Sequence, residues 1–124
     1  MFNKKDLQIR RGDIYYADLN PMRGSEQGGI RPVVVIQNNC GNFHSPTIIV
    51  VSTTTKLDKP SLPTHILIRK SNYDGLEKDS IVMMEQIRTI DRTRLVGYIG
   101  HLNGNTIQSM DRALAVSVGL SQVR

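Results

Sequence analysis

The chain has 124 residues and a mass of 13.9 kDa, which suits one domain with a single modest core and excludes a two-domain enzyme. Sixteen Lys and Arg residues against 11 Asp and Glu give a net charge of +5, which favours an anionic partner such as nucleic acid. No apolar run approaches the roughly 18–20 residues that span a bilayer, and no apolar secretory signal is evident. The single cysteine, Cys40, allows no internal disulfide, so we expect a cytoplasmic protein with no membrane partner.

The first part of the chain reads as an arm followed by strands. Residues 1–10 are polar and charged without periodicity, which predicts a flexible basic N-terminal arm and one domain over residues 11–124. Runs of β-branched and aromatic residues between turn signals are typical of strands. They predict strands over residues 13–19, 32–38, 47–55, 64–70 and 80–90, followed by a short strand that ends near residue 102.

The last part of the chain changes period. Ile107, Met110, Leu114 and Val118 recur at spacings of three, four and four, which predicts one face of an amphipathic helix over residues 103–119. Asn103 or Asn105 can cap its start, and Gly119 can close its end. Short strands followed by one helix indicate an α+β, mainly β protein: a small, partly open barrel with the helix packed against it.

The segment 19–31, LNPMRGSEQGGIR, is longer than a hairpin needs, which is typical of a functional loop. Its glycines do not form a nucleotide-binding P-loop, because the Lys-Ser/Thr ending is missing and a strand follows. A flexible hairpin tip is the alternative interpretation. Arg31 precedes Pro32, so its backbone is extended and its guanidinium is held at a rigid rim. It can grip a phosphate with two parallel hydrogen bonds, or form a surface salt bridge with Glu26.

Other polar groups give weaker signals. In the run 52–55, SerThrThrThr, alternation places Ser52 and Thr54 on one face of a strand and Thr53 and Thr55 on the other, although threonine is also a good strand former. The three histidines could serve acid–base catalysis, yet their spacing favours structural roles, and Cys40 with His44 lacks an orienting third residue. The carboxylates are scattered, so we expect neither a metal site nor a cofactor. The histidines are His44, His65 and His101.

Several motifs together resemble one known family. RRGDIYYADL, GSEQGG-x-RP, SPTIIVVSTTT, LPTHILI and EQIRTID occur in order over residues 11 to about 120 and are similar to the MazF/PemK family of toxin endoribonucleases, particularly its Gram-positive branch. The resemblance implies a small SH3-like barrel of the MazF/CcdB type that works as a two-fold homodimer. It also implies a toxin that cleaves single-stranded RNA, mostly messenger RNA, at short sequences and is silenced by a MazE-type antitoxin.

The resemblance also assigns residues. The family's catalytic arginine falls on Arg31 and its catalytic Ser/Thr on Thr54. Residues that line the RNA groove fall on Ser25, Glu26, Gln27, Gln86 and Arg88, and no cofactor is implied. Gram-positive relatives suggest a short cleavage site that contains U-A-C. The chain departs from the family in its basic arm and in GNTIQSMDR, where close relatives are more acidic, which affects the expected antitoxin contacts.

The implied reaction is in-line attack of the ribose 2'-OH on the adjacent phosphate, which leaves a 2',3'-cyclic phosphate and a 5'-OH. The pKa of arginine lies above 12, so Arg31 suits charge stabilisation better than proton abstraction. Thr54 would orient the phosphate, and Glu26 is the candidate general base. Two alternatives keep the basic surface: a CcdB-like toxin that acts on a protein such as gyrase, and a non-catalytic RNA-binding barrel.

Overall fold

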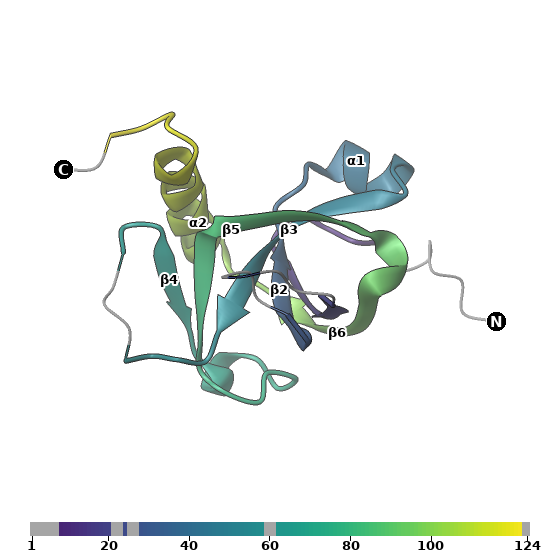
Figure 1. Ribbon diagram of the computed structural model, residues 1–124, viewed down its shortest axis with the longest axis horizontal. Helices are drawn as coiled ribbons and strands as arrows, with labels where there is room; N and C mark the ends of the chain where they lie inside the picture. Colours follow the sequence, from purple (N-terminus) through teal and green to yellow (C-terminus); the bar gives the residue numbers. More distant parts are fainter. Residues whose placement is uncertain (1–7, 21–23, 25–27, 59–61, 123–124) are drawn as a thin grey trace.

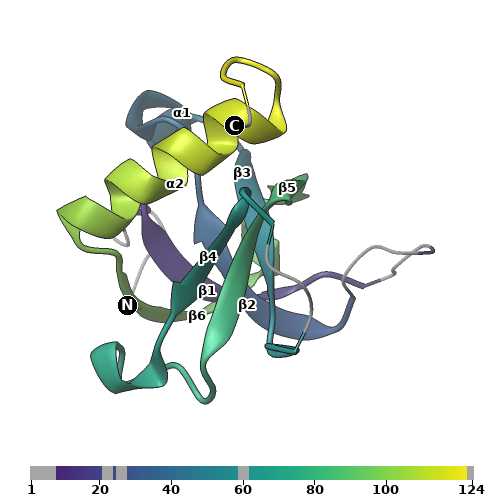
Figure 2. The same cartoon turned by 90° about the vertical axis from the view of Figure 1, so that its left-hand side faces the viewer.

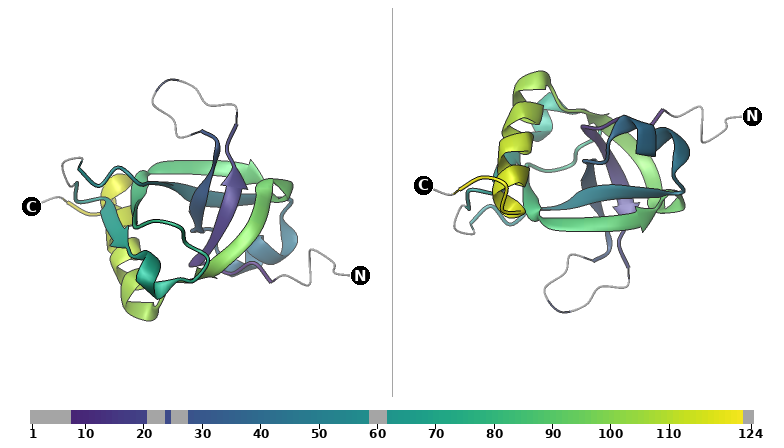
Figure 3. Two further views of the ribbon diagram at one scale, coloured as in Figure 1. Left: turned by 90° about the horizontal axis from the view of Figure 1, so that it is seen from below. Right: turned by 90° about the horizontal axis from the view of Figure 1, so that it is seen from above.

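The protein is a curled, six-stranded antiparallel sheet with one long helix against it (Figure 1). The computed structural model describes residues 8–20, 24, 28–58 and 62–122. The strand order is β4-β5-β3-β2-β1-β6, and Figure 3 shows the sheet bending round toward a barrel. The strands are β1 (Asp13–Asp18), β2 (Ile30–Val35), β3 (Thr47–Thr54), β4 (His65–Ile68), β5 (Ser80–Asp91) and β6 (Leu95–His101). The helices are α1 (Asn39–His44) and α2 (Gly104–Ser117), with single 3-10 turns at η2 (Lys70–Asn72) and η3 (Arg92–Arg94).

The predicted mainly-β fold with a C-terminal helix is confirmed. The helix begins after Asn103, whose side-chain oxygen accepts the Thr106 N–H at 2.8 Å, and Gly119 follows its end with a φ of +82°. Figure 2 shows α2 lying beside β4. At 14 residues it is the longest described helix, and none of the described helices is long and apolar enough to cross a membrane.

The sequence did not predict the short helix α1, which lies in the turn-rich segment 39–46. Asn38 caps it by accepting the Gly41 N–H at 2.8 Å, and Ser45 closes it with a backbone bond to the Gly41 carbonyl. Asparagine at both Asn38 and Asn39 is as typical of a turn as of a helix cap, so the sequence pattern alone did not separate the two.

The core lies on both faces of the sheet. One group of side chains packs between the sheet and α2, and includes Ile14, Val34, Val51 and Met110. The other fills the inside of the curl. Because both faces are covered, the strands are continuous runs of Val and Ile instead of alternating with polar residues. The second group is Ile9, Tyr15, Ala17, Leu19, Val33, Val35, Ile48, Val50, Ile90 and Leu95.

The packed part of the chain starts earlier than predicted. The arm was predicted over residues 1–10, and residues 1–7 lie outside the described part. Ile9, however, is 8% exposed and belongs to the core, and the Arg10 N–H donates to the buried Asp13 carboxylate at 2.8 Å. The segment is anchored because it carries one apolar residue that the inside of the curl can accept.

Gly12 joins three elements at the start of β1. Its N–H donates to the Val35 carbonyl at 2.8 Å, and its carbonyl accepts the Leu102 N–H at 2.9 Å. Its φ is +95°, and an added Cβ would lie 2.8 Å from Ile107 on α2. Next to it, His101 Nδ1 lies 2.7 Å from an Asp13 carboxylate oxygen, which gives this histidine the predicted structural role.

We expect Gly12→Ala to lower the free energy of unfolding by about 1–3 kcal/mol, because a side chain there is strained in φ and meets α2. Urea denaturation measures the change. Gly104→Ala is the matched control, since nothing lies within 4 Å of its added Cβ and its φ is not positive; it should be neutral or stabilising by up to about 1 kcal/mol. Equal stability of Gly12→Ala and the native chain would contradict the expectation.

Candidate functional site

A groove of about 330 Å³ lies where β2 begins and β3 ends. Its walls come from β1, from the segment 28–32, from the end of β3 and from residues 76–80, which lead into β5. Its charged lining residues are Arg31, Lys78 and Glu77. The remaining lining residues are Tyr16, Gly28, Gly29, Ile30, Pro32, Thr53, Thr55, Leu76 and Ser80.

Arg31 is held in place by its own backbone neighbourhood. It is the second residue of β2, is half-buried, and lies opposite Ala17 of β1. Its Nε donates to the Gly28 carbonyl at 2.6 Å. That bond fixes the guanidinium through the inner nitrogen, so the outer nitrogens are the ones that can bind an anion in the groove. The alternative partner, Glu26, lies outside the described residues, as do Ser25 and Gln27.

The threonines at the end of β3 divide between groove and interior. Thr53 and Thr55 line the groove, in agreement with their predicted shared face, and Thr53 Oγ1 donates to the Pro32 carbonyl at 2.7 Å. Thr54 is 2% exposed, and its Oγ1 accepts the Lys56 N–H at 3.2 Å. The register with β5 shifts between Val51 and Thr53, and such a bulge re-aims the side chains that follow it.

Tyr16 holds the far wall of the groove. Its hydroxyl donates to the Gly75 carbonyl at 3.0 Å, which ties the segment that carries Glu77 and Lys78 to β1. Burial raises the pKa of Tyr16, and the nearby Glu77 carboxylate raises it further. Tyr16 is therefore a protonated positioning residue and a poor proton acceptor at neutral pH.

The predicted RNA-binding residues of β5 lie away from the groove lining. Gln86 and Arg88 are both half-buried, and Arg88 Nη1 donates to the Leu19 carbonyl at 3.0 Å. Arg94 donates likewise to the Asp18 carbonyl at 3.0 Å. Two arginines that lie 69 and 76 residues further along the chain than their acceptors thus hold the end of β1, where the long loop begins. Their spacing in the sequence does not reveal this shared contact.

The other end of that loop is fixed by a turn. The Leu19 N–H donates to the Gly29 carbonyl at 2.9 Å, and the Gly29 N–H donates to the Asn20 side-chain oxygen at 2.9 Å. Gly29 has a φ of +77°, a backbone conformation that favours glycine. The loop therefore leaves and rejoins the sheet at a closed neck directly beside Arg31.

A second polar cluster lies on the edge formed by β4 and β5. Glu85 accepts from Thr64 Oγ1 at 2.7 Å, and His65 Nε2 lies 3.0 Å from its other oxygen. Burial raises the pKa of Glu85, but the hydrogen bonds from Thr64 and His65 outweigh burial and leave the pKa below its usual value. His44, on α1, packs edge-on against Phe43 and Cys40 is exposed. Over the described residues, no group of three or more His, Cys, Asp or Glu side chains could hold a metal ion.

Comparisons with known proteins agree with the motif resemblance. A family model described as PemK-like, MazF-like toxin of type II toxin-antitoxin system matches residues 10–118. Endoribonuclease MazF of Staphylococcus saprophyticus subsp. saprophyticus is 49% identical over 116 residues, which cover 94% of this chain and 96% of that protein. A mycobacterial endoribonuclease in complex with its cognate antitoxin is 27% identical, with a TM-score of 0.74 over 93% of this chain and 99% of that chain. MazF of Deinococcus radiodurans, 19% identical with a TM-score of 0.76 over 92% of this chain and 99% of that chain, shares the fold.

The Glu85 cluster predicts a pH dependence of stability. A carboxyl with a lowered folded-state pKa contributes stability above its unfolded pKa, near 4.5, and loses that stability as the pH falls. The melting temperature of the native chain should therefore fall more steeply than that of Glu85→Gln between about pH 5 and about pH 3. The other carboxylates titrate in both proteins, so the difference isolates Glu85. Parallel melting curves over this range would refute the expectation.

Proposed function

Because the chain belongs to the PemK-like, MazF-like toxin family, we propose that this MazF-type endoribonuclease cuts single-stranded messenger RNA at a short sequence without a metal ion. The observation that carries the proposal is the fixed guanidinium of Arg31, which is bonded through Nε to Gly28 at 2.6 Å and faces a groove. A planar fork held at a groove rim suits a phosphodiester. Lys78 on the opposite wall adds a second positive charge.

The proposed reaction uses an oxygen of the substrate as the nucleophile. The ribose 2'-OH attacks the adjacent phosphorus, the bond from phosphorus to the 5'-oxygen breaks, and a 2',3'-cyclic phosphate and a 5'-OH result. Arg31 stabilises the negative charge that grows on the phosphate oxygens in the transition state. Glu26, on the loop whose neck Arg88 and Arg94 hold, takes the 2'-OH proton, and Arg31 donates a proton to the departing 5'-oxygen.

The remaining predicted site residues take supporting roles. We assign Thr54 to orientation of the phosphate, at the strand end where Thr53 bonds to the Pro32 carbonyl directly beside Arg31. Ser25, Gln27, Gln86 and Arg88 are assigned to contacts with RNA outside the scissile bond. The cleavage site is proposed to contain U-A-C, as the motif resemblance suggests.

The proposed partners follow from the family and from charge. A groove of 330 Å³ is too small to hold several nucleotides, and a two-fold homodimer can join two such grooves. We therefore propose a homodimer, and light scattering should give the mass of a dimer. An antitoxin of the MazE type, with an acidic and disordered tail, complements a chain of net charge +5 and should compete with RNA for the groove. The mycobacterial relative in complex with its antitoxin supports this pairing. We propose that the protein acts on messenger RNA in the cytoplasm.

We expect Arg31→Lys to lower the cleavage rate by about 10²- to 10³-fold while RNA binding persists, because lysine keeps the charge and loses the planar fork. Single-turnover cleavage of a defined RNA measures the rate. Lys78→Arg is the control, since it keeps a cation on the opposite wall and should retain most activity. A folded Arg31→Lys protein that cuts as fast as the native chain would refute the assignment.

We expect Thr54→Val to lower the cleavage rate more than Thr55→Val, if the hydroxyl of Thr54 orients the phosphate. Both changes keep the side-chain shape and remove one hydroxyl. Thr54 is 2% exposed in this structure whereas Thr55 is exposed in the groove. The two variants therefore distinguish a buried hydroxyl from an exposed one as the group that acts on the phosphate. The reverse order of rates would move the role to Thr55 on the groove wall.

The experiment that tests the function is cleavage of a defined single-stranded RNA in EDTA, with end mapping. A second RNA carries one deoxyribose, 5' of the scissile phosphate, which removes the nucleophile and leaves the phosphates in place. We expect the normal RNA to be cut to a cyclic phosphate, and the second RNA to bind with a similar salt dependence and remain intact at that bond. Cleavage of the second RNA there would indicate water as the nucleophile. If neither RNA is cut, the result would favour a toxin that acts on a protein, or a non-catalytic RNA-binding barrel.

A further inference from the structure

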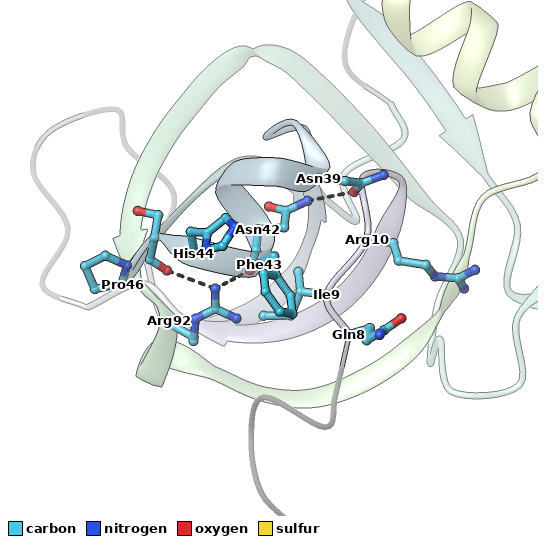
Figure 4. Close-up of a pocket in the computed structure, with 10 residues that line it drawn as sticks. Gln8, Ile9, Arg10, Asn39, Asn42, Phe43, His44, Pro46 and Arg92 are labelled. Atoms are coloured by element: carbon cyan, nitrogen blue, oxygen red, sulfur yellow. Dashed lines mark hydrogen bonds between the residues drawn. The ribbon is translucent and has the colours of Figure 1, made fainter.

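A second hollow, of about 530 Å³, lies at the end of β2 away from Arg31 (Figure 4). It is formed by the segment 8–10, by α1 with the two residues after it, and by Arg92 at η3. Figure 4 shows the Phe43 ring among the lining residues, between Arg92 and the segment that carries Gln8, Ile9 and Arg10. Its volume falls in the range of roughly 300–1,000 Å³ that is common for small-ligand sites. The proposed cleavage reaction does not use it.

The side chains of this hollow suit a nucleotide. Phe43 is 68% exposed, and its contact with His44 is edge-on, with ring centroids 4.7 Å apart, so the ring is not covered by a parallel stack. Three of the lining side chains are basic, namely Arg10, His44 and Arg92, and none of the described lining residues is acidic. Arg10 Nη2 lies 3.7 Å from the buried Asp13 carboxylate, and the Arg10 side chain is still 53% exposed. An exposed aromatic ring beside cations is the arrangement that single-stranded nucleic acids use for stacking and phosphate neutralisation.

The platform that carries Phe43 is rigid. Arg92 Nη2 donates to the carbonyls of Asn42 and Ser45, the latter at 2.9 Å, and so ties α1 to the turn after β5. The Asn42 side chain is buried and donates to the Gln37 carbonyl at 2.9 Å and to the Asn39 side-chain oxygen at 3.1 Å. An exposed ring on a fixed support needs little ordering when a ligand binds.

We propose that this hollow, which we name the Phe43 site, binds a nucleotide of the RNA that flanks the cleaved bond, with the base stacked on Phe43 and the phosphate near Arg10. The proposal rests on the endoribonuclease function above. From Arg31 to Ile36 the extended chain covers roughly 17 Å, at about 3.3 Å per residue. An RNA must therefore extend beyond the groove to reach the Phe43 site, and the site adds affinity only for longer substrates.

The composition of the hollow favours RNA over a protein partner. Its walls combine cations with the amide side chains of Gln8 and Asn39, which can hydrogen-bond to base edges. The neighbouring hollow of about 310 Å³ shares Ile9 and Arg92 with the Phe43 site, but its other lining residues include the exposed Val96 and Tyr98 of the edge strand β6. That apolar strand edge has the character of a protein contact.

The test compares RNAs of increasing length. Each carries a single deoxyribose 5' of the scissile phosphate, so that binding is measured without cutting, and is extended stepwise on its 5' or its 3' side from the shortest bound RNA. Fluorescence anisotropy gives the Kd for the native chain, Phe43→Ala and Phe43→Tyr. Leu120→Ala is the control, because Leu120 is an 82% exposed apolar residue outside both sites.

We expect Phe43→Ala to raise the Kd of the extended RNAs on the order of 10-fold and to leave the Kd of the shortest RNA unchanged. Phe43→Tyr keeps an aromatic ring, so it should bind the extended RNAs as tightly as the native chain does. Equal affinities of Phe43→Ala and the native chain for every length would overturn the proposal. So would an equal loss for the shortest RNA, or a changed mass in light scattering, which would make this face an interface between copies. Cleavage of the unmodified RNAs is read separately, so failure of the endoribonuclease function is distinguishable from failure of the Phe43 site.

Discussion

The hydrogen bond from Arg31 Nε to the Gly28 carbonyl sets the character of the candidate site. It joins the residue with the strongest phosphate-binding geometry to the last part of the long loop, at the point where that loop rejoins the sheet. Strand β2 positions one side of this bond and the turn at Gly29 positions the other. The loop and the guanidinium are thereby placed by the same few atoms, and a disturbance of the loop neck reaches Arg31 directly.

The loop neck and the end of α1 are held by three arginines of one short segment, residues 88–94. Arg88 and Arg94 donate to carbonyls at the end of β1, and Arg92 donates to carbonyls at the end of α1. Each of these arginines satisfies backbone groups that an end of a strand or helix leaves open. Part of the basic character of this chain thus serves the fold. An excess of arginine is therefore an incomplete guide to which residues contact RNA.

The fold followed from the sequence wherever one local pattern dominated. The Val and Ile runs predicted the central strands, because a strand covered on both faces has no polar alternation, and the stripe of Ile107, Met110 and Leu114 predicted α2. The position of Arg31 at a rigid rim was predicted because Pro32 restricts its backbone, whereas its assignment as a catalytic residue rests on the motif resemblance. The short helix α1 was missed since its Asn residues suit a turn equally well. The contact of Arg88 with Leu19 could not be predicted, because it joins β5 to the residue after β1, and these two strands are not neighbours in the sheet. Alternation predicted that Thr53 and Thr55 share a face, but it did not indicate that this pair, and not Ser52 with Thr54, lines the groove.

Arg31 lies near the start of β2 and the α1 segment follows its end, and the last three residues of the strand, Val33, Val34 and Val35, are all 0% exposed. Alternate side chains of such a strand are committed to opposite layers of the core. Insertion or removal of one residue would therefore turn Arg31 out of its groove and reverse the packing of every valine. The distance between the two ends of β2 can change only by pairs of residues, in steps of roughly 7 Å. A β2 strand of different length that keeps both Arg31 in its groove and the valines in the core must therefore be longer or shorter by two residues or a multiple of two.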